Sequence, residues 1–147
     1  MKKTLRFLLT FVFLLIFSGC STSVQSDTFE SDIGGTIVDV TLTHKKDKIV
    51  AIKQTTSYPM ESFATEWTDE IKDDLQENFS QEYADLTDTE GVKATFDFTD
   101  TTMEVTLDFD LEKADTEKLK ELLGTDFSTL SYEQAAKTFE VKGYTKK

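Results

Sequence analysis

Residues 92–109, VKATFDFTDTTMEVTLDF, form the stretch that decides the fold. Apolar side chains occupy every second position on both sides of a polar centre, and Lys, Thr, Asp and Glu fill the positions between them. This period of two is typical of strands with one buried and one hydrated face. Because Thr99–Thr102 supplies a turn, the segment predicts a β-hairpin. The expected buried positions are Val92, Ala94, Phe96 and Phe98 in one strand and Met103, Val105, Leu107 and Phe109 in the other.

A second hairpin is predicted earlier in the chain. Residues 36–43 alternate in the same way, and residues 48–58 are rich in β-branched and aromatic side chains. The polar run 44–47 separates them and predicts the turn. Residues 29–33 form an additional candidate strand, followed by a turn or bulge at Gly34–Gly35.

Three helices complete the prediction. From residue 65 to 86 apolar side chains recur every three or four positions, which is typical of a helix with one apolar face, and Thr65 is the expected N-cap. Asp115 begins a short helix that stops at Gly124, and Ser131 begins the last helix. The apolar positions of the long helix are Trp67, Ile71, Leu75, Phe79, Tyr83 and Leu86.

These elements predict an α+β fold in the order ββ-α-ββ-α-α. An antiparallel sheet of two β-hairpins, packed on one face by the long amphipathic helix and the short C-terminal helices, would bury every apolar stripe. Residues 28–147 are expected to form this single domain, a length that fits one hydrophobic core.

The first twenty residues indicate export. Three cations, Lys2, Lys3 and Arg6, precede a short apolar run that ends at Phe17. The run is about a dozen residues long, whereas a helix that spans a bilayer needs about 20. Residues 1–19 are therefore predicted to be a signal peptide.

The end of this run resembles the bacterial lipobox, with Phe17, Ser18, Gly19 and Cys20 in order. The resemblance implies that Cys20 receives diacylglycerol and becomes the first residue after cleavage. Two acyl chains hold a protein stably on a membrane. Residues 20–27 are then expected to be the lipidated cysteine and a polar tether.

Composition excludes several classes of function. The formal charge of −12 becomes about −15 when residues 1–19 are removed, and Arg6 is the only arginine. Nucleic-acid binding is excluded because it depends on Lys and Arg, and anionic lipid headgroups would repel the domain. Cys20 is the only cysteine, so its lipidation leaves no thiol for a disulfide or a nucleophile.

The chain resembles the YehR-like family of small bacterial lipoproteins, a family of unknown function. The resemblance implies an exported, lipid-anchored α+β domain and brings no catalytic residues. It rests on the order and spacing of the lipobox, Val40–Thr43, Asp47–Val50, Lys53–Thr56, Gly91–Val92, and the late helix from Ser131 to Gly143–Tyr144.

His44 is the only histidine, so a hydrolytic triad or a histidine-based metal site would have to use it. It lies beside Lys45 and Lys46 in the predicted turn. A general base must be oriented by its surroundings, so the prediction is an exposed turn histidine with no catalytic role.

Closely spaced carboxylates are the remaining chemical candidates. Asp108 and Asp110 invite a cation-binding interpretation, but an EF-hand loop starting at Asp108 would need Gly and Glu where the chain has Lys113 and Leu119. A looser cation site stays open against a solvated acidic face. Its candidate ligands are Asp97, Asp100, Asp108 and Asp110; no metal or cofactor is predicted.

The aromatic side chains on the apolar face of the long helix allow two interpretations. Trp67, Phe79 and Tyr83 could line a ligand groove, but their helical spacing favours core packing.

The predicted function is that of a non-enzymatic accessory lipoprotein that binds another envelope protein. A lipoprotein that binds a small ligand or divalent cation is the alternative, which a pocket between sheet and helices would favour. An envelope hydrolase that uses carboxylates is a third class. The domain is expected on the extracytoplasmic side of a cell membrane, and the sequence leaves open whether that membrane is inner, outer or single.

Overall fold

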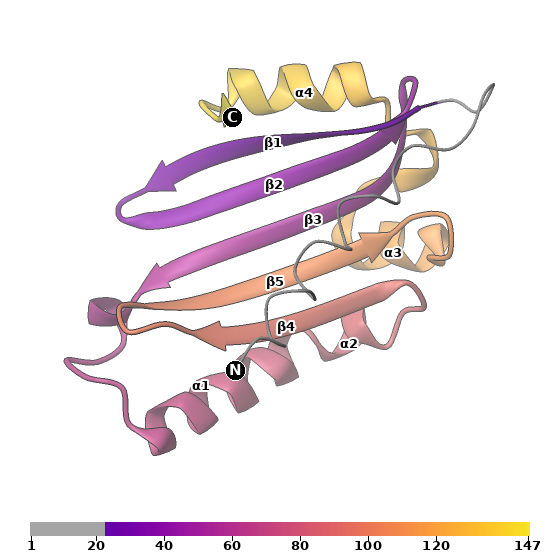
Figure 1. The fold of residues 1–147 in the computed structure, drawn as a ribbon. Helices are drawn as coiled ribbons and strands as arrows, with labels where there is room; N and C mark the ends of the chain where they lie inside the picture. Colours follow the sequence, from indigo (N-terminus) through magenta and orange to yellow (C-terminus); the bar gives the residue numbers. More distant parts are fainter. Residues whose placement is uncertain (1–22) are drawn as a thin grey trace, which may run out of the picture.

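The fold is built on one antiparallel sheet, drawn in Figure 1. The computed structural model describes residues 23–147. Within this range the sheet has six strands in the order β4-β5-β3-β2-β1-β6. The strands are β1 (Val24–Ile33), β2 (Thr36–Lys45), β3 (Lys48–Pro59), β4 (Val92–Phe98), β5 (Thr102–Asp110) and β6 (Thr145–Lys146). The helices are α1 (Asp69–Glu82), α2 (Ala84–Thr87), α3 (Thr116–Leu123) and α4 (Tyr132–Val141), with 3₁₀ turns at Met60–Ser62 and Phe127–Thr129.

The hairpin predicted from residues 92–109 is confirmed as β4 and β5. Phe96 pairs with Val105, and this register puts the apolar side chains of both strands on one face. Thr99 closes the turn, because its backbone N–H donates to the Thr102 carbonyl at 2.9 Å. The predicted division into a buried and a hydrated side is therefore correct.

The N-terminal half forms a three-stranded meander rather than a single hairpin. β1 pairs with β2 along its whole length, from Val24 with Lys45 to Ile33 with Thr36. The turn between them uses Gly34 and Gly35 at φ 63° and 92°, a left-handed conformation that glycine adopts at little cost.

This meander corrects the predicted start of the domain. The sequence predicts residues 24–27 to be part of the tether, but they are the first four residues of β1. Their polar side chains suggested a linker, whereas their backbone groups are bonded to β2. Residues 24–27 are therefore part of the sheet and not of the predicted tether.

β3 joins the two halves of the sheet by pairing with both β2 and β5 in the antiparallel sense. The short β6 adds a further pairing, Phe29 with Lys146 and Glu30 with Thr145, at the β1 edge. The α+β class is as predicted. The structure contains three elements in addition to the predicted order ββ-α-ββ-α-α, namely β1, α2 and β6.

The long helix starts later than predicted. Thr68 is the N-cap of α1, and its hydroxyl accepts a hydrogen bond from the Ile71 N–H at 3.2 Å. Thr65 and Trp67 precede the helix. Apolar periodicity does not locate a helix boundary by itself, whereas a capping hydroxyl followed by the acidic first turn at Asp69 does.

The two C-terminal helices begin at their predicted caps. The Asp115 carboxylate accepts from the Lys118 N–H at 3.0 Å, and the Ser131 hydroxyl accepts from the Gln134 N–H at 3.3 Å. α3 ends at Gly124 in the left-handed conformation, as predicted. Within residues 23–147, no helix is both long and apolar enough to cross a membrane.

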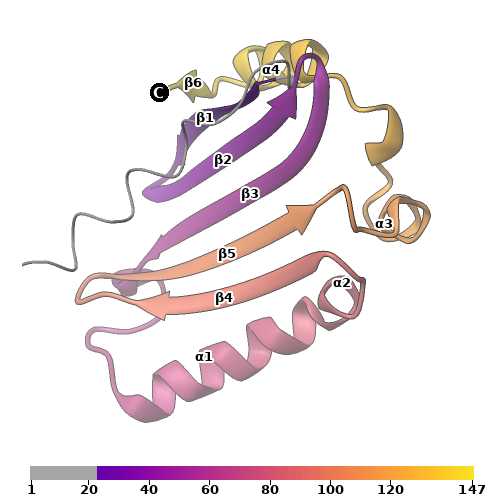
Figure 2. The ribbon, with the colours of Figure 1, turned by 45° about the vertical axis from the view of Figure 1, so that its right-hand side comes forward.

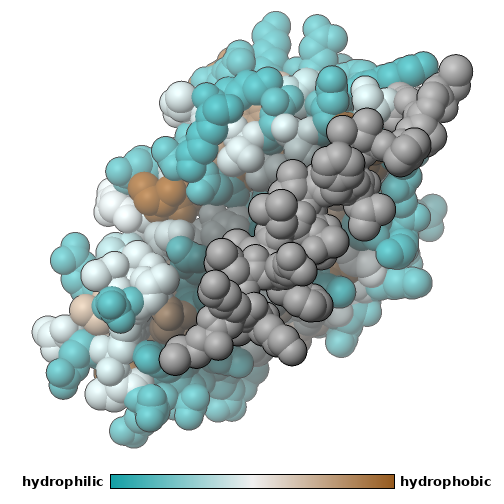
Figure 3. Space-filling model, viewed as in Figure 1, coloured by the Kyte–Doolittle hydropathy of each residue, from teal (hydrophilic) through white to brown (hydrophobic). Residues whose placement is uncertain are grey.

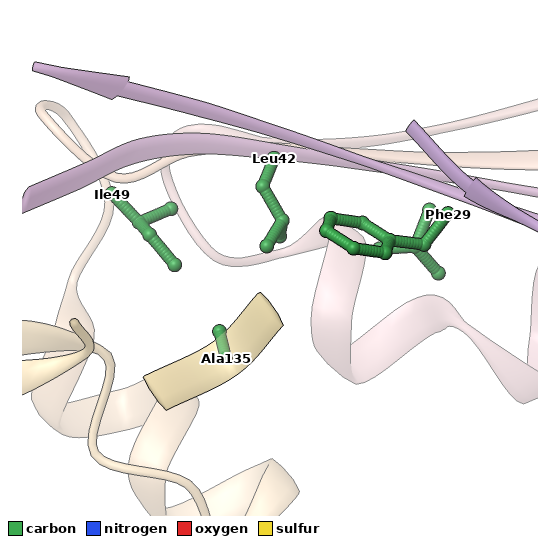
Figure 4. Close-up of a cluster of buried hydrophobic side chains, with 5 residues drawn as sticks. Phe29, Leu42, Ile49 and Ala135 are labelled. Carbon is green, nitrogen blue, oxygen red and sulfur yellow. The ribbon is translucent and has the colours of Figure 1, made fainter. Parts of the chain in front are cut away.

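The apolar side chains of the sheet face the helices, which are arranged around it in Figure 2. Two core clusters result. The first lies under α4, where the close-up in Figure 4 shows side chains of the sheet directed toward Ala135; it comprises Phe29, Val40, Leu42, Ile49 and Ala135. The second lies under α2 and α3 and comprises Val92, Leu107, Phe109 and Leu119.

The opposite face of the sheet is polar. Cross-strand hydroxyl pairs stabilise it, with Thr28 and Thr41 oxygens 2.8 Å apart and Thr55 and Thr106 oxygens 3.0 Å apart. Figure 3, which has the viewpoint of Figure 1, shows a surface that is mostly hydrophilic.

Candidate functional site

A groove lies between the two core clusters on the helix-covered face. Its volume is about 620 Å³, within the range of about 300–1,000 Å³ that is typical of small-molecule sites. α4 bounds the groove on the side of β1 and β2, and residues of α2 and α3 bound it on the side of β4 and β5. The helices thus cover the two ends of the sheet face and leave its middle accessible.

The floor of the groove comes from the three middle strands of the sheet. Leu42 of β2, Ile52 of β3 and Leu107 of β5 supply an apolar surface. Gln54 projects from the centre of this floor and pairs in register with Val40 and Leu107. Its amide donates to the Thr56 hydroxyl at 3.4 Å, a long hydrogen bond that leaves the amide available to a ligand.

One wall of the groove is polar. Gln134, Thr138 and Lys142 follow one another at intervals of four residues along α4, so they form a single stripe on the helix. All three are exposed at the rim. Ala135 and Phe139 lie beside this stripe and pack toward the sheet.

The other wall is apolar. It consists of Leu86 at α2, Leu123 at the end of α3 and Phe127 in the following 3₁₀ turn. Tyr83 also lines the groove, and burial raises the pKa of its phenol above the usual 10.0. The phenol therefore keeps its proton at neutral pH and can act only as a hydrogen-bonding group.

The charge of the groove differs from that of the whole chain. Of the 147 residues, 28 are Asp or Glu, yet none of the described residues that line the groove is acidic. None of them is a histidine or cysteine either, and the only charged side chain among them is Lys142. This lining can bind and orient a molecule, but it offers no carboxylate, imidazole or thiol for proton transfer or nucleophilic attack.

Sequence reasoning did not identify the groove. A usable signal was Gln54, which interrupts the apolar positions of a strand that is central in the sheet. The prediction that Trp67, Phe79 and Tyr83 pack in the core is only partly correct. Trp67 and Phe79 contact Phe98 and Phe96 with ring centroids 5.2 and 6.4 Å apart. Tyr83 packs against the second core cluster but also lines the groove.

Away from the groove, His44 belongs to a cluster of polar side chains. The prediction that it is an exposed turn residue is wrong. The imidazole is only 4% exposed at the end of β2, because the turn is confined to Lys46 and Asp47. Lys46 takes the left-handed conformation at φ 55°, and its carbonyl lies 2.5 Å from His44 Nδ1. Since a carbonyl only accepts, Nδ1 carries the proton and donates.

The other partners of His44 come from both ends of the domain. Its ring stacks on Tyr132 with centroids 3.7 Å apart, and Nε2 lies 3.6 Å from the Asp27 carboxylate, too far for a hydrogen bond. Tyr132 donates to the same carboxylate at 2.5 Å, and Lys146 lies 2.9 Å from its other oxygen. The cluster therefore joins β1, β2, α4 and β6.

The four candidate cation ligands are not brought together. Asp97 pairs with Glu104 near the turn of the β4–β5 hairpin, where Asp100 also lies. Asp108 and Asp110 are at the opposite end, because position 108 lies four steps along the strand from position 104, a distance of about 13 Å. In the described part of the chain, no group of three His, Cys, Asp or Glu side chains could hold a metal ion.

The lipobox residues Phe17, Ser18, Gly19 and Cys20 lie outside the described residues, as does the rest of the signal peptide. Their predicted lipidation stays a prediction.

The fold and the groove together define an α+β domain with an open antiparallel sheet, one face of which is covered by helices. The chain belongs to the family described as "Protein of unknown function (DUF1307)", which matches residues 25–145. This agrees with the resemblance to the YehR-like family, and the function of the family is unknown. None of the curated proteins compared matches the chain.

Two solved structures share the fold. The NMR structure of the E. coli YehR protein has a TM-score of 0.70 and 20% identity, over 86% of this chain and 93% of that one. The NMR structure of a protein from Streptococcus pneumoniae TIGR4 has a TM-score of 0.64 and 15% identity, over 90% of both chains. Both of these proteins consist almost entirely of the shared fold.

Proposed function

We propose that this protein is an exported, lipid-anchored, non-enzymatic binding protein of the bacterial envelope, and that it holds a small molecule in the groove on the helix-covered face. The observation that supports the binding role is the groove itself, a space of about 620 Å³ with an apolar floor and a few convergent polar groups.

The anchor is supported by the lipobox and by the position of the first strand. If Cys20 carries the lipid, only Ser21–Ser23 separate it from β1 at Val24. Three residues span at most about 11 Å. The end of the domain that holds Val24 and the β2–β3 turn then lies close to the bilayer.

The non-enzymatic role is supported by the composition of the groove. Catalysis of hydrolysis needs a nucleophile, an acid or a base close to the substrate. The described lining holds no carboxylate, imidazole or thiol, and no hydroxyl or lysine in it is paired with such a group, while His44 and its partners belong to a separate cluster. The groove therefore suits retention of a molecule better than its conversion.

The groove can be tested by filling it. Gln54→Trp places a large side chain at the centre of the floor, in a strand where an aromatic residue is well tolerated. Lys53→Trp is the matched control, because Lys53 is the neighbouring residue and lies exposed on the opposite face. Residues 21–147 of each variant are screened by thermal shift against small metabolites, divalent cations and amphipathic compounds.

We expect at least one compound to stabilise the wild type and Lys53→Trp saturably, by about 2.7 kcal/mol at 100 times its Kd. Gln54→Trp should abolish this stabilisation while it unfolds cooperatively. A compound that binds all three proteins equally, or the absence of any ligand for the wild type, contradicts a ligand role for the groove.

A second candidate function, binding to another envelope protein, is favoured by the opposite face of the sheet. Polar side chains such as Lys53, Thr55 and Thr106 cover this broad surface. A photo-crosslinking residue at position 55 should capture one reproducible neighbour in cells if this face is an interface. The same residue at exposed position 73 of α1 is the control.

A further inference from the structure

We infer that the groove takes an amphipathic carboxylate of the fatty-acid type, with its apolar chain over the floor and its head at Lys142. This inference rests on the proposed ligand role of the groove and names the chemical class of the ligand.

The apolar body follows from the floor and the inner wall. Leu42, Leu107 and Phe109 are at most 7% exposed although they line the groove, so they lie deep within it. A charged group placed against them would lose its hydration without gaining a partner, which is strongly unfavourable. An apolar chain instead gains about 25 cal/mol for each Å² that it buries there.

The position of the head follows from the polar wall on α4. Gln134, Thr138 and Lys142 line the rim, and Lys142 is the one cation among the described lining residues. Lys142 forms no ion pair with any residue in the described range. Its ammonium group is therefore free to bind an anion.

The sign of the head follows from the charges around the groove. The C-terminal end of α4 contributes a partial charge of about −0.5, while Lys142 at that end contributes a full positive charge. No described lining residue is acidic, so a cationic head would find no counter-ion inside the groove. An anionic head finds its counter-ion in the Lys142 ammonium group. Inside the groove, such a head is also kept away from the carboxylates that dominate the rest of the surface.

Three ligands with the same chain and different heads test this inference by calorimetry on residues 21–147. Decanoate should bind more tightly than decanol, and decanol more tightly than decylamine.

Lys142→Gln should weaken decanoate binding about three- to fivefold, as expected for the loss of an exposed charge pair, and leave decanol binding unchanged. Lys137→Gln is the matched control, because Lys137 is an exposed lysine of the same helix that does not line the groove.

The outcomes distinguish a failure of the proposed ligand class from a failure of the groove as a ligand site. Equal binding of decanoate and decylamine, no effect of Lys142→Gln, or binding that survives Gln54→Trp would each overturn the inference. If another compound of the screen binds and is blocked by Gln54→Trp, the groove is a ligand site for a different class. If nothing binds the wild type, the ligand role fails together with its proposed class.

Discussion

The imidazole of His44 shows how single residues hold this fold together. Its two ring nitrogens face oxygen atoms of Lys46 and Asp27, and its face lies on Tyr132. Only Nδ1 has a hydrogen-bond partner, the Lys46 carbonyl, whereas Nε2 is buried without one. Loss of the Lys46 partner would leave a second buried polar atom unsatisfied, at a cost of about 1–3 kcal/mol. The cluster therefore fixes the edge of the sheet where the first strand, the last helix and the last strand meet.

Asp27 gives this cluster a pH dependence. The Tyr132 hydroxyl, followed by Lys146, lowers the pKa of Asp27 below its ordinary value of 3.8. A carboxyl group with a lowered pKa in the folded state contributes stability that is fully present above the ordinary pKa. That contribution is lost as the pH falls through the folded value, because the unfolded chain then binds the proton more readily.

We expect Asp27→Asn to destabilise the domain by about 1 kcal/mol at pH 6 and to reduce the loss of stability between pH 5 and pH 2. Urea unfolding at several pH values measures both effects. Asp73→Asn on the exposed surface of α1 is the control and should follow the wild-type profile. Some pH dependence will remain, since the pKa values of Asp47, Asp110 and Asp126 are also lowered. A profile for Asp27→Asn that matches the wild type at every pH contradicts this account.

At the scale of elements, strands and caps were predicted more reliably than the start of the long helix. The alternation in residues 92–109 specifies β4 and β5 because successive side chains of a strand point to opposite faces of the sheet. Asp115 and Ser131 specify their helix starts through a hydrogen bond to a backbone N–H. In α1, by contrast, Thr65 and Thr68 are both possible caps, and only the geometry shows that Thr68 is used.

This difference gives a test at the start of α1. Thr68→Ala removes the hydroxyl that accepts from the Ile71 N–H and should lower stability by about 1 kcal/mol. Thr65→Ala should change stability by less than about 0.5 kcal/mol, since that residue precedes the helix. Chemical denaturation of the two variants measures the difference, and a larger effect at position 65 would favour the boundary that the sequence predicts.

At the scale of the whole molecule, the arrangement of helices over the sheet creates the groove. α4 covers β1 and β2, while α2 and α3 cover the other end, and the two core clusters share no buried residue. Ile52 belongs to the periphery of both clusters. The middle strands thus carry an apolar surface that the helices leave accessible from one side.

The proposed anchor is also a property of the whole molecule. Cys20→Ala in the full chain should abolish incorporation of labelled fatty acid and retention in the membrane fraction. The thermal unfolding of the domain should stay unchanged, because every described element begins at or after Val24. Retention of label and membrane association in Cys20→Ala would show that the lipobox assignment is wrong.

The sequence by itself determined the α+β class, the β4–β5 hairpin, the two C-terminal helices and the division of that hairpin into a buried and a hydrated face. These features depend on interactions between residues that are close in the chain, such as side-chain alternation and helix capping. Only the tertiary structure decided that residues 24–27 belong to β1, that His44 is buried, and that a groove lies between the helices. Each of these depends on partners distant in the sequence, such as Tyr132 for Asp27 and His44, and no local pattern records which distant segments meet.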